Sequence, residues 1–237
     1  MLKPSSLKQT FSKAGMLTLT LLISAHAYSE SLIEQGKAIA NSGSAGVLAC
    51  ITCHGAQGEG NSAANFPFLA GQGAAYLSEQ LTHFHQGSRS NPVMEPIAKA
   101  MSAEQIQAVA AYYSELPAPW DKTALSNLVD IYPDEQQLGA WIANRGSWGD
   151  NIPACIQCHG PGGVGVGTAF PAIAGLSAAY ISAQFKAWKD DTRDPGPLSL
   201  MGDIAKRMND QQIQATADYF AGLPAQLQQA GAQGAKP

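Results

Sequence analysis

The strongest constraint on the fold is an internal repeat, because the two halves of the chain have similar sequences. CITCHG at residues 50–55 returns as CIQCHG at residues 155–160, and NFPFLAGQGAAYLSEQL returns as AFPAIAGLSAAYISAQF. The match continues from MEPIAKAMSAEQIQAVAAYYSELP to MGDIAKRMNDQQIQATADYFAGLP, while the offset between the halves drifts only from 104 to 107 residues. Two units of about 90 residues each predict a tandem pair of one small domain.

The repeat also sets the domain boundaries. We expect the first domain at residues 28–117 and the second at residues 134–237. The stretch between them, residues 118–133, contains Pro119 and Pro133 and has no counterpart inside either unit. Proline and the loss of periodicity mark a linker.

The first 27 residues have the features of a cleaved export signal. Lys3, Lys8 and Lys13 give a basic start, the apolar run MLTLTLLISA follows, and the small residues of AHA end at Ala27. This order predicts a secretory signal peptide over residues 1–27, cleaved near Ala27, and hence a periplasmic protein. A membrane anchor is the alternative, but the apolar run is about half of the ~20 residues that span a bilayer.

The exported chain is expected to be acidic. Loss of the three lysines of the signal changes the formal charge from −4 to −7. An acidic exported protein is a poor candidate for binding nucleic acid, and it suits a partner with a basic docking face. Asp190, Asp191 and Asp194 cluster in the second half and are the predicted docking surface; the alternative is that they only form a solvated loop. A peripheral association with the membrane is compatible with this composition.

Within each half the periodicity is that of helices, and no segment has a convincing strand pattern. Capping boxes at Ser102 and Asn209 open the final helix of each half, and both helices are expected to end at Leu-Pro. The predicted first and middle helices are residues 31–43, 133–146, 73–87 and 177–191. The fold class is therefore all-α, as two tandem domains. Units this small bury little apolar surface, so we expect a large apolar group inside each.

The repeated word itself predicts that group to be haem. Cys50 and Cys53 are three residues apart, so on a helical turn both thiols project to one side and reach one porphyrin edge. His54 then lies under the ring and binds the iron, which is why C-x-x-C-H is the attachment word of c-type haem. The second half repeats the set as Cys155, Cys158 and His159. We expect two covalently attached haem c groups per chain.

Other uses of the word are less favoured. A thioredoxin-like dithiol needs a βαβ context, which is absent from the pattern. A zinc site at Cys50, Cys53 and His54 lacks a fourth ligand, and adjacent Cys53 and His54 are poorly placed to bind one small ion. A Cys50–Cys53 disulfide closes only a tiny loop and leaves His54 without a role.

The chain resembles the di-haem class I cytochromes c of the cytochrome c4 type over its whole mature region. The resemblance rests on the two C-x-x-C-H words, on NFPFLAGQGAAYLSEQL with its second copy, and on the MxxIAKxM segment before each final helix. It implies two small all-α cytochrome domains, related by a pseudo-twofold axis, each wrapped round one covalent haem. It also implies that the two haems lie close together.

The sixth iron ligand is expected to be methionine. His83 and His85 have no counterparts in the second half, whereas the mature chain keeps two methionines in each half. Met94 and Met201 lie in proline-rich loops and are favoured as ligands. The alternative ligands are the methionines directly before the capping residues Ser102 and Asn209. At that position a methionine is expected to act as a hydrophobic staple, and in the family pattern the position belongs to a core leucine. These alternatives are Met101 and Met208.

His/Met ligation determines the expected chemistry. A soft thioether favours ferrous iron and raises the potential, and two filled axial positions leave no place for a small-molecule substrate. By resemblance, the carbonyls of Pro67 and Pro171 accept a hydrogen bond from the second nitrogen of the ligand histidines. A plain loop role is the alternative for both prolines.

These features predict an electron carrier and not an enzyme. The main hypothesis is a periplasmic di-haem cytochrome that passes single electrons between respiratory redox partners. The alternative is the cytochrome subunit of a periplasmic dehydrogenase that oxidises sulfide, thiosulfate or an alcohol. A di-haem peroxidase is less favoured, because it needs one open haem face and the repeat supplies a methionine to both.

Overall fold

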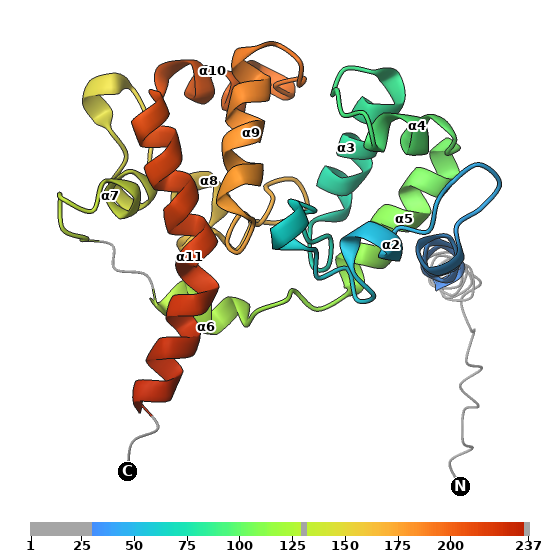
Figure 1. Cartoon of the computed structure of the whole chain (residues 1–237), viewed down its shortest axis with the longest axis horizontal. Helices are drawn as coiled ribbons and strands as arrows, with labels where there is room; N and C mark the ends of the chain where they lie inside the picture. The colour runs from blue at the N-terminus through green and yellow to red at the C-terminus, as the bar shows by residue number, and fades with distance from the viewer. Residues whose placement is uncertain (1–29, 129–131, 235–237) are drawn as a thin grey trace, which may run out of the picture.

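The computed structural model describes residues 30–128 and 132–234. The predicted signal peptide and its cleavage at Ala27 lie outside the described residues, as do the first two residues of the first predicted domain. Figure 1 shows two helical lobes side by side, one formed by the first half and one by the second. The described residues contain no β-strand, only isolated bridges. The predicted all-α fold is therefore confirmed.

The two lobes share one order of elements. The first contains a helix over residues 30–42, α2 (Ile51–His54), η1 (Ser62–Ala64), α3 (Ala74–Gln86), α4 (Met94–Lys99) and α5 (Ala103–Glu115). The second contains α7 (Leu138–Arg145), η2 (Trp148–Asp150), α8 (Ile156–His159), η3 (Pro161–Gly163), α9 (Ala178–Lys189), η4 (Pro197–Ser199), α10 (Leu200–Arg207) and α11 (Asp210–Gly234). Between them lies α6 (Lys122–Leu128).

The capping boxes predicted for the final helices are confirmed. At the start of α5, the Gln105 N–H donates to Ser102 Oγ at 3.2 Å, and the Ser102 N–H donates to Gln105 Oε1 at 2.9 Å. Asn209 and Gln212 repeat the pair at 2.9 Å in both directions. Each box satisfies two backbone donors that a helix start leaves free.

Two predicted helix ends are wrong. Helix α7 begins at Leu138 rather than Pro133, because Asp134 forms a turn in which its Oδ1 accepts the Gln136 N–H at 2.9 Å. Such a side-chain turn competes with the first helical turn. Helix α11 runs through Leu223 and Pro224 to Gly234, although a proline interrupts the hydrogen bonding of a helix.

The carbonyl that each proline leaves free has a partner in both halves. Because Pro224 has no N–H, the Phe220 carbonyl four residues earlier lacks its helical donor. The Gly175 N–H donates to that carbonyl at 2.9 Å. In the first half, the Gly71 N–H donates to the carbonyl of Tyr113, four residues before the proline of Leu-Pro, also at 2.9 Å. Each final helix is thereby tied to the loop that precedes the middle helix.

The first and last helices of each lobe cross closely. A Cβ on Gly36 would overlap the carbonyl of Ala108, and a Cβ on Gly139 would overlap that of Ala215. Each lobe has its own apolar core, with ten buried residues in the first cluster and sixteen in the second, to which Phe68 of the first half also belongs. The second cluster therefore extends beyond its own lobe, whereas the first does not.

The predicted linker contains a helix that touches both lobes. Leu125 of α6 is fully buried in the core of the second lobe. Ser126 Oγ donates to the Pro161 carbonyl at 3.3 Å, and Lys122 Nζ donates to the Gly71 carbonyl at 3.2 Å. Residues 118–128 are thus held against both lobes.

The lobes meet through a symmetric pair of backbone hydrogen bonds. The Ser90 N–H donates to the Thr192 carbonyl at 2.8 Å, and the Asp194 N–H donates to the Ser88 carbonyl at 2.7 Å. The offset is 104 residues for both pairs of equivalent positions, so each half makes the same contact with the other. Such reciprocity is the signature of a local twofold axis. No helix of residues 30–128 or 132–234 combines the length and the apolar character needed to cross a bilayer.

Candidate haem sites

Each C-x-x-C-H word forms a single helical turn with the cysteine at its N-cap. The His54 N–H donates to the Cys50 carbonyl and the His159 N–H to the Cys155 carbonyl, both at 2.9 Å. Gly55, with φ 85°, ends the first turn. All four cysteines are free of disulfides and half-buried, which leaves the thiols available for thioether bonds. The two histidines are buried.

The two histidines are held in one orientation by the same contact. The Nδ1 of His54 lies 2.8 Å from the Pro67 carbonyl oxygen, and the Nδ1 of His159 lies 2.8 Å from that of Pro171. Since a carbonyl only accepts, Nδ1 is the protonated nitrogen and Nε2 keeps its lone pair. Burial lowers the pKa of both histidines, although the hydrogen bond opposes this shift. The neutral form of each ring is therefore favoured, and its Nε2 keeps a lone pair that can bind a metal.

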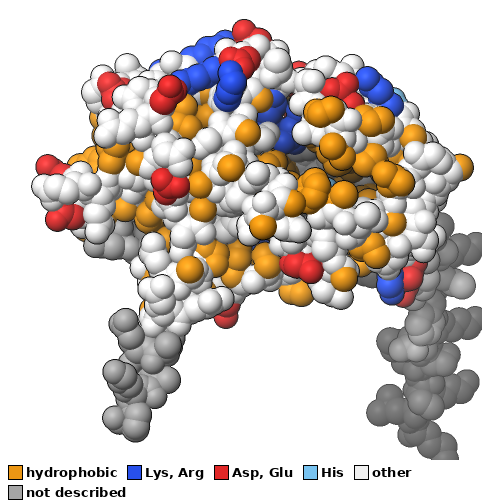
Figure 2. Space-filling model, viewed as in Figure 1, with side chains coloured by type: hydrophobic (Ala, Val, Ile, Leu, Met, Phe, Trp, Pro, Cys, Tyr) orange, Lys and Arg blue, Asp and Glu red, His pale blue; other side chains and the backbone are white. Residues whose placement is uncertain are grey.

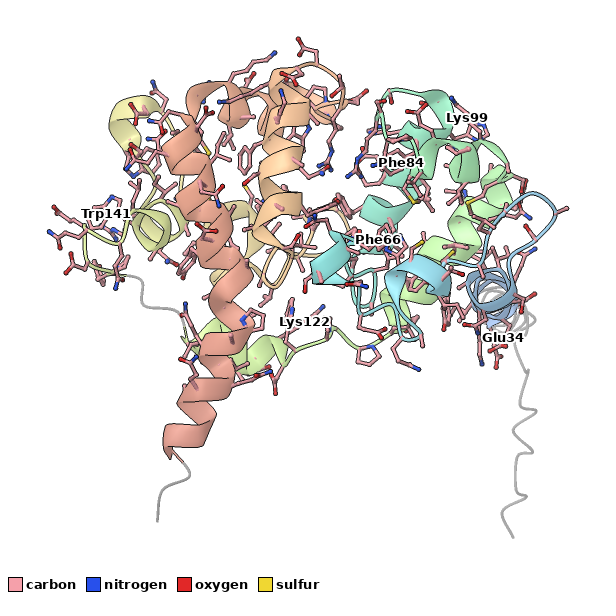
Figure 3. All side chains as sticks on the ribbon, viewed as in Figure 1. Glu34, Phe66, Phe84, Lys99, Lys122 and Trp141 are labelled. Atoms are coloured by element: carbon pink, nitrogen blue, oxygen red, sulfur yellow. The ribbon has the colours of Figure 1, made fainter. Side chains whose placement is uncertain are left out.

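The first half contains a cavity of about 500 Å³ beside its C-x-x-C-H turn. Its walls are mostly apolar, and both Met94 and Met101 line it. Side chains of α9 from the second lobe complete the wall, so the cavity lies at the boundary of the lobes. Figure 3 shows Phe66 and Phe84, which also line the cavity, on the side of the first lobe that faces α9. Its size is in the range of cofactor sites.

The four methionines differ in burial. Met101 is 3% exposed and Met208 is 2% exposed, and both belong to the apolar cores. Met94 and Met201 are only partly buried. The prediction that both lie in loops is wrong, because Met94 is the first residue of α4 and Met201 lies inside α10. The burial of Met101 and Met208 is compatible with the staple prediction, whereas Met94 and Met201 are less enclosed.

Two arginines at the lobe boundary lack an anionic partner. Arg89 and Arg193 are 6% and 5% exposed, and both line the cavity. They share acceptors: Gln184 Oε1 accepts from Arg89 at 2.7 Å and from Arg193 at 2.8 Å, and Gln80 Oε1 accepts from them at 2.9 and 3.0 Å. No carboxylate of residues 30–128 or 132–234 pairs with either arginine.

This arrangement fits a haem. Buried charges require a compensating partner, and the Nε of Arg193 has none. A haem bonded at one edge to Cys50 and Cys53 presents carboxylate side chains away from that edge, and such carboxylates match two guanidinium groups. The repeat offered a signal for this pair, because Arg89 and Arg193 occupy equivalent positions.

The predicted acidic docking cluster is partly neutralised. Asp190 pairs with Lys186 at 2.6 Å and Asp191 pairs with Lys206 at 3.2 Å. Asp194 Oδ1 accepts the N–H of the glycine two residues on, at 2.8 Å. Figure 2 shows acidic and basic side chains mixed on top of the second lobe, and hydrophobic side chains gathered on the first lobe beside the hollow between them.

The fold and the paired sites define a two-domain, all-α protein built to hold two haems covalently. The cytochrome c family profile matches residues 33–117. The chain is 45% identical to the "Thiosulfate dehydrogenase electron acceptor" of Stutzerimonas stutzeri (strain A1501), over 89% of this chain and 93% of that protein. It is 32% identical to cytochrome c4 of Pseudomonas aeruginosa, over 88% of this chain and 96% of that protein.

A solved structure gives the same result. Reduced recombinant cytochrome c4 from Pseudomonas stutzeri matches with a TM-score of 0.64 at 28% identity, over 82% of this chain and 97% of that one. The chain belongs to the cytochrome c family, as a di-haem class I member of the cytochrome c4 type. It carries two covalently bound haem c groups and transfers electrons.

Proposed function

We propose that this cytochrome is an exported one-electron carrier that takes electrons from a thiosulfate dehydrogenase. The supporting observation is the 45% identity, over 93% of its length, to a protein named for accepting electrons from that enzyme. Among the substrates that the sequence analysis considered for a partner dehydrogenase, this identity supports thiosulfate, with this chain as the electron acceptor. The chain itself would not be the enzyme.

We assign one set of ligands to each haem. His54 and Met94 would bind the first iron, and His159 and Met201 the second. The covalent bonds would come from Cys50, Cys53, Cys155 and Cys158. The support is that each histidine is fixed through Nδ1 by the carbonyl of Pro67 or Pro171, and that Met101 and Met208 are already packed in the cores.

These residues would set the chemistry of the bound group. Haem supplies a one-electron iron centre whose potential follows its axial ligands. The proline carbonyls fix the imidazole planes and raise the basicity of the nitrogen that faces iron. The apolar walls exclude water, and a soft thioether on the opposite face favours the ferrous state. With both axial positions filled, no small-molecule substrate has a place to bind.

The export signal, the domain division and the docking surface belong to the same proposal. Residues 1–27 would direct the chain to the periplasm, and residues 28–117 and 134–237 would form the two cytochrome domains. The net charge of −7 of the exported chain supports a partner with a basic docking face. The aspartate cluster contributes less to that surface than expected, because Asp190 and Asp191 are paired with lysines.

Stopped-flow reduction tests the proposed donor. The oxidised, haem-loaded protein is mixed with thiosulfate and a thiosulfate dehydrogenase, and the reduced haem bands are followed. We expect both haems to be reduced, faster than those of an ordinary cytochrome c4 under the same conditions, and no reduction by thiosulfate alone. Equal or slower reduction than the cytochrome c4 control contradicts a dedicated acceptor. A rate that falls with added salt supports a basic docking face, since screening weakens opposite charges.

A further inference from the structure

One buried side chain of the first lobe is bonded to the backbone of the second. Gln72 is 4% exposed and lies just before α3. Its Nε2 donates to the Ala172 carbonyl at 2.8 Å, and its Oε1 accepts the Ala172 N–H at 2.9 Å. A side-chain amide that both donates to and accepts from one residue fixes the backbone there in position and direction.

The bonded peptide is the one that orients His159. The Ala172 N–H and the Pro171 carbonyl belong to the same planar peptide unit, so fixing the N–H also fixes the direction of the carbonyl. That carbonyl oxygen lies 2.8 Å from His159 Nδ1. A peptide whose N–H is hydrogen-bonded is also polarised, which strengthens its oxygen as an acceptor. A continuous chain of hydrogen bonds therefore runs from Gln72 through this peptide to His159.

A second contact holds the same stretch of backbone. The Tyr76 N–H donates to the Thr168 carbonyl at 2.9 Å. Gly73 allows this approach, because a Cβ there would overlap the Thr168 carbonyl oxygen. The start of α3 thus fixes both ends of residues 168–172 of the other lobe.

The first lobe has no equivalent of this clamp. The position that matches Gln72 is Leu176, which has no polar side-chain atom. In the part of the chain that the structure describes, no side chain of the second lobe hydrogen-bonds Phe68, the counterpart of Ala172. Phe68 instead packs edge-on against Trp120, with ring centroids 5.9 Å apart. The two histidines therefore have the same immediate contact but different support behind it.

We propose that Gln72 is a positioning residue for the second haem, through which the lobe interface lowers the potential of that haem. The inference rests on the proposed role of His159 as an iron ligand. A stronger hydrogen bond from Nδ1–H makes the imidazole a better donor to iron and favours the ferric state. The clamp therefore lowers the potential of the second haem.

The test replaces Gln72 with methionine, an apolar side chain of similar length. In the haem-loaded protein we expect the ferrous/ferric equilibrium of the second haem to shift about threefold toward ferrous. This is ~30 mV, because a tenfold change is about 59 mV for one electron. The first haem should shift by less than this, although Gln72 also lines the cavity of the first half. The His159 Nδ1 proton should exchange with solvent several-fold faster, whereas that of His54 should not. Potentials come from spectroelectrochemical titration, with each haem assigned by its hyperfine-shifted proton resonances.

Two further variants separate positioning from general loosening of the interface. Gln72→Glu keeps an acceptor for the Ala172 N–H, so the potential of the second haem should not rise. Asn65→Gly removes a different bond between the lobes, from Ser177 Oγ at 2.8 Å, at a position whose φ of 59° suits glycine. It should leave the potential of the second haem unchanged.

Three outcomes would overturn the proposal. They are unchanged potential and proton exchange in Gln72→Met, an equal shift of both haems, and an equal shift in Asn65→Gly. Two haems per chain and two intact sulfur–iron charge-transfer bands in Gln72→Met show that the ligands are in place. If the ligand assignment itself is wrong, the wild-type protein should already lack one or both sulfur–iron charge-transfer bands.

Discussion

The backbone that leads to the proposed methionine ligand has a different conformation in the two lobes. In the first lobe, Asn91 Oδ1 accepts the N–H of Val93 at 3.0 Å and of Met94 at 2.9 Å, which caps the short helix α4. In the second lobe the connection is three residues longer. There Leu198 and Ser199 adopt left-handed conformations, with φ of 61° and 57°, before α10 begins.

The C-x-x-C-H turns and their histidines, by contrast, have the same backbone geometry in both lobes. Both C-x-x-C-H turns have the same internal hydrogen bond, and both histidines meet a proline carbonyl at 2.8 Å. A covalently attached porphyrin and its proximal histidine demand one geometry. A methionine side chain is flexible, so it can approach the other face of a haem from backbones of different geometry. The lobes therefore have the same geometry at the C-x-x-C-H turn, where the attachment allows little variation. They differ in the backbone that carries the methionine, where more than one geometry is tolerated.

The largest difference between the lobes should appear when each loses its haem. Cys50→Ala with Cys53→Ala, and Cys155→Ala with Cys158→Ala, should each leave one haem per chain in a haemochrome assay. We expect the first double variant to lose more helix by circular dichroism, because its core is a separate cluster of ten buried residues, whereas the second core also packs against Phe68 of the first lobe and Leu125 of α6. Equal loss of helix would show that haem, and not the apolar core, holds both lobes together.

The methionine ligands should be exchangeable in the same way in both lobes. Met94→His and Met201→His should each leave one haem six-coordinate and low-spin with a lower potential. A drop on the order of 0.1 V is expected, within the ~0.8 V that axial ligands span. Redox titration with visible spectra measures both. If either variant leaves both charge-transfer bands and potentials unchanged, that methionine is not a ligand.

Conversely, the buried methionines should matter only for packing. Met101→Leu and Met208→Leu conserve volume, so each should lower the free energy of unfolding by less than ~1.5 kcal/mol. Denaturant titration of the haem-loaded protein gives the value. Loss of one sulfur–iron charge-transfer band in either variant would reverse the ligand assignment for that lobe.

The smallest effect concerns the longer loop of the second lobe. Leu198 is 88% exposed and left-handed, a conformation that is costly for a branched side chain and tolerated by asparagine. Leu198→Asn should therefore raise the free energy of unfolding by ~0.5–1 kcal/mol. The matched change in the other loop, Val93→Asn, replaces a residue with φ −92° and should give no such gain.

Much of the site could be predicted from the sequence because the signals are local. A C-x-x-C-H turn specifies its own attachment geometry, and a capping box such as Ser102–Gln105 satisfies backbone groups within one turn. The end of α11 could not be predicted in this way. Pro224 should stop a helix, yet Leu223 is 1% exposed in the core and the Phe220 carbonyl has another donor, so tertiary packing outweighs the local preference.

By itself, the sequence determined the duplication, the all-α fold class, the two haem attachment words and the candidate ligands. These are properties of residues a few positions apart or of one half compared with the other. Only the tertiary structure decided that Arg89 meets Arg193 and that Gln72 reaches Ala172, 100 residues away. Such contacts depend on how the lobes pack against each other, and nothing in the local pattern of either half encodes that geometry.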